Sequence, residues 1–194
     1  MSVFLSTLQT YIRGILAHVP GMHWAVIGVV SLALTVFIVG RKKCSVFGAI
    51  ALGIAVFSGL FLLDTAVVIR YLGMMGHASG YDLAFDFSRI FRSGSVSAEM
   101  LSNLAAFIPY GFFLSESPAS TKSFHAGRRL GLVTLAGFGL SLCIECLQLL
   151  LHVGFFELTD LVMNTLGAFV GVLISTGLRK VVGERTHALS ALID

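Results

Sequence analysis

The sequence predicts an all-α fold, a polytopic membrane bundle of about five transmembrane helices. Three observations support this class. Of the 194 residues, 56% are hydrophobic and only 12% are charged, and the mean hydropathy is +0.92, which is far too apolar for a water-soluble domain of this length. Five apolar stretches approach the roughly 20 residues needed to cross a hydrocarbon core about 30 Å thick. Polar side chains gather at one end of three of these stretches.

We expect the spans, in order, at residues 22–40, 45–63, 100–115, 130–151 and 161–178. They form a single transmembrane domain, 22–178, followed by a cytoplasmic tail, 179–194. Residues 1–20 lack the basic start and small-residue cleavage site of a signal peptide. Their apolar residues recur at spacings of three and four, which predicts an amphipathic interfacial helix; a frayed terminus is the alternative. The apolar residues concerned are Phe4, Leu5, Leu8, Ile12, Ile15 and Leu16.

Lys and Arg residues in the short connections predict the orientation, because cytoplasmic loops are enriched in them. Nine lie on one side of the predicted spans: Arg41, Lys42, Lys43, Lys122, Arg128, Arg129, Arg179, Lys180 and Arg185. The N-terminus is therefore expected outside and the C-terminus in the cytoplasm. The net charge of +3 then reflects topology, and no nucleic-acid partner is expected.

The long connection 64–99 is predicted to lie outside the membrane, and a connection of this length usually has a function or its own structure. Its arginines, Arg89 and Arg92 among them, suit lipid phosphates or another anionic ligand. A solvated loop with an aromatic membrane anchor is the other interpretation.

Several small or ring-constrained residues predict helix packing rather than chemistry. Pro109 removes a backbone donor from the third span, so a kink is expected near Ala105, and Gly111 follows it. Gly167 and Gly171 lie four residues apart in the fifth span, a spacing that lets another helix approach closely.

Five polar residues occur at the same end of the third, fourth and fifth spans: Asn103, Glu145, Gln148, Asp160 and Asn164. Such residues are costly in a bilayer, about 2.5 to 3.5 kcal/mol for a charged one near a helix centre, so they predict a polar site. The span that holds Glu145 contains no Lys or Arg. Glu145 must therefore be protonated, hydrogen-bonded by a neighbouring amide, or paired with a loop arginine such as Arg89. Asp160 has a simpler interpretation, favouring a helix N-terminus behind a Thr159 cap.

No metal or other cofactor is expected. The three cysteines, Cys44, Cys143 and Cys146, lie in apolar surroundings and suit buried packing better than a disulfide or a redox pair. Neither they nor His152 shows the close ligand spacing of a zinc site.

The order of these residues resembles the signature of the VanZ-like membrane protein family over about residues 86–175. The matching positions are Asn103, Phe107, Pro109, Gly111, Leu114, Glu145, Gln148, Asp160, Asn164, Gly167 and Gly171. The family is named for a protein associated with low-level teicoplanin resistance, and similar proteins occur beside cell-envelope and exopolysaccharide genes. This sequence departs from many relatives in two places. Residues 86–91 lack a proline that those relatives have. The arginine that often precedes the aspartate corresponding to Asp160 is also missing, and Glu157 lies near that position.

The resemblance implies a bacterial inner-membrane protein of envelope biogenesis or glycopeptide resistance, whose outer-leaflet pocket engages a lipid-linked precursor or a lipoglycopeptide. In an enzymatic version, Glu145 and Asp160 supply general acid and base, while Asn103, Gln148, Asn164, Arg89 and Arg92 bind the substrate. The alternative is a non-catalytic scaffold in which the polar residues lock the helices and the loop recruits another component. A small transporter is a weaker third hypothesis, since five spans enclose little room unless a homodimer supplies another wall.

Overall fold

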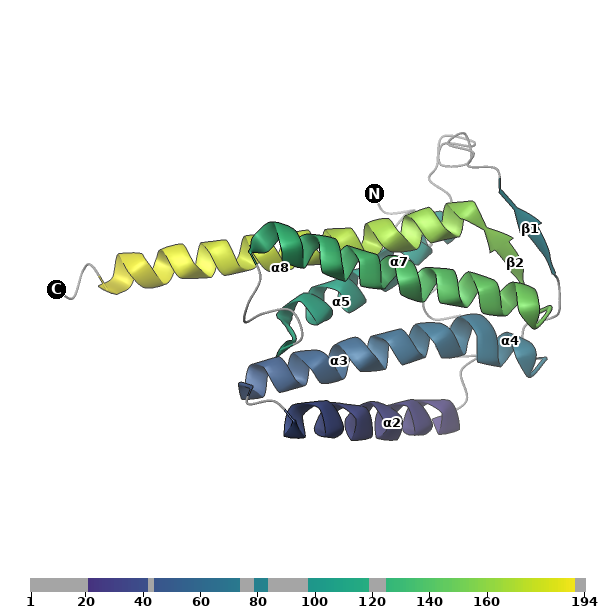
Figure 1. Cartoon of the computed structure of the whole chain (residues 1–194), viewed down its shortest axis with the longest axis horizontal. Helices are drawn as coiled ribbons and strands as arrows, with labels where there is room; N and C mark the ends of the chain where they lie inside the picture. Colours follow the sequence, from purple (N-terminus) through teal and green to yellow (C-terminus); the bar gives the residue numbers. More distant parts are fainter. Residues whose placement is uncertain (1–20, 42–43, 74–78, 84–97, 119–124, 191–194) are drawn as a thin grey trace.

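The computed structural model describes residues 21–41, 44–73, 79–83, 98–118 and 125–190 (Figure 1). Helices dominate these residues, which confirms the all-α prediction. The elements in chain order are α2 (Gly21–Gly40), α3 (Val46–Leu63), the π-helical turn η1 (Asp64–Val68), α4 (Ile69–Tyr71), β1 (Gly80–Asp82), α5 (Ala98–Glu116), α7 (Ala126–Leu150), β2 (Phe155–Glu157) and α8 (Leu158–Ser190). The predicted interfacial helix, 1–20, and the two arginines Arg89 and Arg92 lie outside the described residues.

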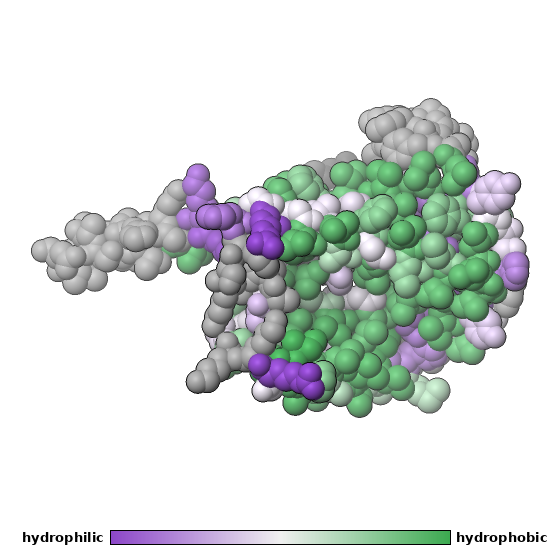
Figure 2. All heavy atoms as spheres, viewed as in Figure 1, coloured by the Kyte–Doolittle hydropathy of each residue, from purple (hydrophilic) through white to green (hydrophobic). Residues whose placement is uncertain are grey.

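Four helices are long and apolar enough to cross a membrane: Gly21–Gly40, Val46–Tyr71, Ala126–Leu150 and Leu158–Val182. Each corresponds to one of the predicted spans. Large apolar side chains on their outer faces are exposed, for example Val29 at 68% and Leu135 at 63%, as expected for surfaces that meet lipid. In Figure 2 the apolar surface covers the middle of the molecule, and hydrophilic residues gather toward its two ends.

The fifth helix, α5, corresponds to the third predicted span but is not among the four described helices that are long and apolar enough to cross a membrane. It packs against α3, α7 and above all α8. Because other helices cover it, α5 can carry polar side chains such as Ser102 and Ser115, which are both buried. Pro109 lies inside α5, and helical backbone continues on both sides of it.

Three glycines let the backbones of α5 and α8 approach closely. A Cβ atom at Gly111 would overlap the carbonyl oxygen of Ala168, one at Gly167 would overlap that of Leu104, and one at Gly171 would overlap that of Ile108. The overlapped atoms belong to rigid backbone and cannot rotate away. Only glycine, whose side chain is a hydrogen atom, fits at these three positions. Small residues commonly allow such close helix contacts in membrane proteins.

The predicted loop 64–99 is wrong in its first eight residues, because the helix that began as α3 continues through η1 and α4 to Tyr71. The span continues past Asp64 for two reasons: residues 65–69 are mostly apolar, and His23 on α2 binds the Asp64 carboxylate. Beyond it, β1 pairs in parallel with β2, with Tyr81 opposite Phe156. We call the end of the bundle that carries β1 and β2 the strand end.

The other end of the bundle carries the continuation of α8. The predicted fifth span ended at residue 178, but α8 continues as one helix to Ser190 and extends beyond its neighbours (Figure 1). Near this end, Arg179 donates two hydrogen bonds to the Glu116 carboxylate, at 2.8 and 2.7 Å, and Arg129 donates one to Thr176 at 3.0 Å. These arginines thus also tie α5, α7 and α8 together.

Candidate functional site at the strand end

Glu145 lies on α7 at the strand end and is only 2% exposed. Its Oε2 atom accepts a hydrogen bond of 2.9 Å from the backbone N–H of Glu157, the last residue of β2. α8 begins at the next residue, and the N–H groups at a helix start carry partial positive charge. The buried carboxylate is therefore bound by a backbone donor at the start of α8, which was not among the partners expected from the sequence.

Gln148 lies one turn beyond Glu145 and is also buried. Its Nε2 atom donates a hydrogen bond of 3.0 Å to the carbonyl oxygen of Ala66, within the π-helical turn η1. In that turn the N–H of Ile69 bonds to the carbonyl of Asp64, five residues back. Such turns often occur at functional sites. Here η1 gives α7 a polar contact with the end of α3.

Asn164 and Asn103 have different environments. Asn164 is buried, and its Nδ2 atom donates a hydrogen bond of 2.9 Å to Ser141, one turn before Glu145 on α7. Asn103 is half-buried on α5, next to Leu104, whose carbonyl faces Gly167. In the part of the chain that the structure describes, Asn103 takes no part in the side-chain hydrogen bonds of the other four residues.

Asp160 is half-buried in the first turn of α8, one turn before Asn164. The negative charges of Asp160 and Glu157 both act on Glu145, and the positive charge of Arg70 opposes them. The site thus holds three carboxylates and one arginine close to the start of a helix.

Arg70 is the residue of this site that sequence reasoning missed. Its guanidinium reaches Gly154, in the turn after α7: a Cβ atom at Gly154 would lie 3.0 Å from Arg70 Nη1 and 3.1 Å from Gln148 Cδ. Glycine at position 154 therefore leaves the room that this guanidinium and amide occupy. The signal that could have identified Arg70 is the apolar run 65–69, which continues the helix and places Arg70 near its end.

A second polar contact at the strand end, between His23 and Asp64, was also missed. Nδ1 of His23 lies 2.8 and 3.0 Å from the two carboxylate oxygens of Asp64, and each side chain is 11% exposed. This pair ties the start of α2 to the end of α3. Sequence reasoning placed Asp64 in a loop and so did not look for its partner.

A tight turn connects α7 to β2. The N–H of Val153 bonds to the carbonyl of Gln148 at 2.9 Å, His152 adopts a positive φ of 56°, and Val153 is 2% exposed. β2 follows at once and donates to Glu145. The Glu157 N–H occupies one oxygen of this carboxylate, Oε2, so a ligand that takes the same oxygen must replace that backbone donor.

Metal ligands do not converge in the described part of the chain, where no three His, Cys, Asp or Glu side chains are placed to hold an ion together. Cys44, Cys143 and Cys146 are free thiols, and Cys143 is exposed rather than buried as expected. It lies on the outward side of α7, away from the Glu145 contact.

One of the comparisons with known proteins identifies the family of this chain. The family model VanZ/LLP1 matches residues 61–179, more than half of the chain. No curated protein and no solved structure shows significant similarity. The matched region contains all five predicted polar residues together with Asp64 and Arg70, whereas α2 and most of α3 precede it. The chain therefore belongs to the VanZ/LLP1 family of membrane proteins.

Proposed function

We propose that this protein acts in the bacterial inner membrane and that its strand end engages a lipid-linked envelope precursor or a lipoglycopeptide at the outer leaflet. The orientation rests on the positive-inside rule. Arg41, Arg128, Arg179 and Lys180 lie at the end opposite the strands, so that end belongs in the cytoplasm. The strand end then faces the side on which envelope precursors are used.

The observation that carries this proposal is the position of Arg70 over Gly154 and Gln148, beside the buried Glu145. A guanidinium presents several N–H donors in one plane and suits phosphate oxygens bidentately. Arg70 lies near the end of a 26-residue span, which is the depth of lipid headgroups. A phosphate that links a lipid to a sugar would lie at this depth, with its hydrocarbon in the bilayer.

Glu145 has two roles in the proposal. In the resting protein its carboxylate holds β2 through the Glu157 N–H. With a ligand bound, displacement of β2 frees the carboxylate to accept a hydrogen bond from a sugar or peptide group. In the enzymatic version the freed Glu145 and the nearby Asp160 act as general acid and base. Arg89 and Arg92 remain additional anion contacts in this proposal.

The test is a mass-spectrometric profile of lipid-linked precursors in cells that lack the protein. Complementation uses the natural sequence, Arg70→Gln or Arg128→Gln at matched membrane abundance. Arg128 is the control because it is an exposed arginine at the opposite end. We expect the natural sequence and Arg128→Gln to restore the profile and Arg70→Gln to fail. An unchanged profile in the deletion, or full restoration by Arg70→Gln, would refute the proposal.

A non-catalytic scaffold is the second candidate, and the Glu145–Glu157 hydrogen bond favours it, because holding a strand is a structural task. Glu145→Gln separates the two candidates. The amide oxygen can still accept the Glu157 N–H, but the amide cannot transfer a proton as a carboxylate does. Full restoration by Glu145→Gln would exclude acid–base chemistry at this position and favour a binding or scaffold role.

A further inference from the structure

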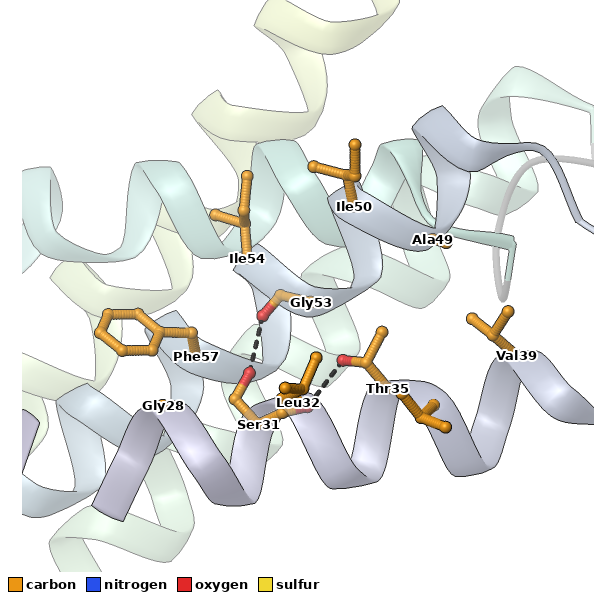
Figure 3. A pocket seen from close by; sticks show the side chains of 11 residues that line it. Gly28, Ser31, Leu32, Thr35, Val39, Ala49, Ile50, Gly53, Ile54 and Phe57 are labelled. Atoms are coloured by element: carbon orange, nitrogen blue, oxygen red, sulfur yellow. Dashed lines mark hydrogen bonds between the residues drawn. The ribbon is translucent and has the colours of Figure 1, made fainter. Parts of the chain in front are cut away.

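A groove of about 470 Å³ runs between α2 and α3, away from the site described above (Figure 3). Its walls include Gly28, Leu32 and Val39 from α2 and Ile50, Gly53 and Phe57 from α3. All of these residues precede the region that the family model matches, 61–179. The groove is thus a property of the part of this chain that lies before the family region.

The groove offers no free hydroxyl donor to a ligand. Ser31 and Thr35 supply its hydroxyls, and both already donate: Ser31 to the carbonyl of Gly53 at 2.9 Å, and Thr35 to the carbonyl of Ser31 at 2.7 Å (Figure 3). The remaining lining is aliphatic or aromatic. An apolar cavity is a poor site for water, which needs two to four polar partners. Hydrocarbon fits this lining.

The dimensions of the groove match one leaflet of a bilayer. From Gly28 to Val39 the helix rises about 16 Å at 1.5 Å per residue, roughly half of a 30 Å hydrocarbon core. Toward the strand end, Trp24 stacks on Phe57 and Phe61, with ring centroids 6.2 and 4.9 Å apart. Of these three rings Phe57 lines the groove, so Trp24 lies in direct contact with a lining residue at that end.

Charge favours an anionic headgroup at the other end of the groove. α2 ends there at Gly40, and the next residue, Arg41, is exposed and places its guanidinium 4.2 Å from the centroid of the Phe37 ring. No Asp or Glu occurs anywhere in residues 21–63. Basic residues beside a membrane attract anionic lipids, by about 1 kcal/mol for each Lys or Arg near the surface.

We propose that this groove binds one acyl chain of an anionic phospholipid, with the headgroup at Arg41 and the end of the chain toward Phe57. The cytoplasmic leaflet follows from the orientation proposed above, whereas the lipid class rests on the lining and the charge. The bound chain fills the space beside α2, which packs chiefly on α3. It therefore stabilises the attachment of α2 to the rest of the bundle.

Trp24 provides a readout, because it is the single tryptophan of the chain and it stacks on Phe57, which lines the groove. The full-length protein is reconstituted into vesicles whose lipids carry bromine near the ends of their acyl chains. Bromine quenches tryptophan fluorescence at short range. We expect quenching by brominated phosphatidylglycerol to exceed quenching by brominated phosphatidylcholine at equal bromine density. Equal quenching by the two lipids would overturn the proposal without any variant.

A variant pair locates the effect. Ala49→Phe places a ring in the groove near its basic end, several turns from Trp24, whereas Ala106→Phe adds the same ring at an exposed position on α5. We expect Ala49→Phe to abolish the excess quenching by phosphatidylglycerol and Ala106→Phe to keep it. An excess that survives Ala49→Phe refutes the groove as its source. An excess that disappears when the protein-to-lipid ratio is raised tenfold instead assigns the groove to a second copy of the chain.

Discussion

Replacing Glu145 tests whether the buried carboxylate holds β2 at the start of α8. Glu145→Leu removes the acceptor and leaves the Glu157 N–H without its partner. An unpaired buried polar group costs about 1 to 3 kcal/mol, so we expect the free energy of unfolding to fall by about 2 kcal/mol. Glu145→Gln keeps an acceptor oxygen. Both replacements remove the repulsion that Asp160 and Glu157 exert on the Glu145 charge, so the difference between the two variants comes from the acceptor. Glu145→Gln only weakens the charge-assisted bond, and its net change is expected within about 1 kcal/mol.

The assay is reversible denaturation of the purified protein in mild detergent, followed by helical circular dichroism, together with hydrogen exchange at β2. We expect faster exchange at residues 155–157 in Glu145→Leu than in Glu145→Gln, because only the first loses the acceptor. A Glu145→Leu protein that is as stable as the natural sequence, with unchanged exchange at β2, would refute this account of the carboxylate.

Three further predictions concern the helix contacts. Gly111→Val is expected to cost at least about 3 kcal/mol, because α5 must move away from the Ala168 backbone. Gly139→Val is the control and should change stability little, because nothing lies within 4 Å of a Cβ atom at that position. The free energies of unfolding of the two variants are compared under one condition. His23→Ala is expected to cost about 3 kcal/mol, because it leaves the Asp64 carboxylate unpaired. Adding Asp64→Leu to this variant should recover most of the lost stability. A double variant that is less stable than His23→Ala alone would contradict this prediction. Arg179→Gln is expected to cost roughly 1 kcal/mol, because the Arg179 side chain is 34% exposed and that of its partner Glu116 is 10% exposed. This loss of stability should be smaller in high salt, which screens the charges. A loss that does not change with salt would show that packing rather than charge is responsible.

The sequence predicted much of the bundle but only part of the site. Gly167 and Gly171 were identified as packing positions from their spacing alone, because a four-residue repeat places them on one face of a helix. Glu145 was identified as a buried group that needs a partner. Its partner could not be inferred, because a backbone N–H has no sequence signature and depends on where β2 lies. Arg70 was expected only among the arginines of the connection 64–99, because the apolar span was predicted to end at residue 63 and not to continue through η1 and α4.

Composition and periodicity by themselves determined that this chain is a helical membrane protein, because a residue's preference for lipid or water is local and adds up along the chain. They also determined which end of the bundle is polar, since that follows from depth within each span. Only the tertiary structure decided that Glu145 binds the start of α8, that Gln148 contacts η1, and that Arg70 rather than a more distant arginine stands beside them. Such contacts join segments far apart in sequence, and angstrom-scale distances between those segments depend on packing of the whole bundle.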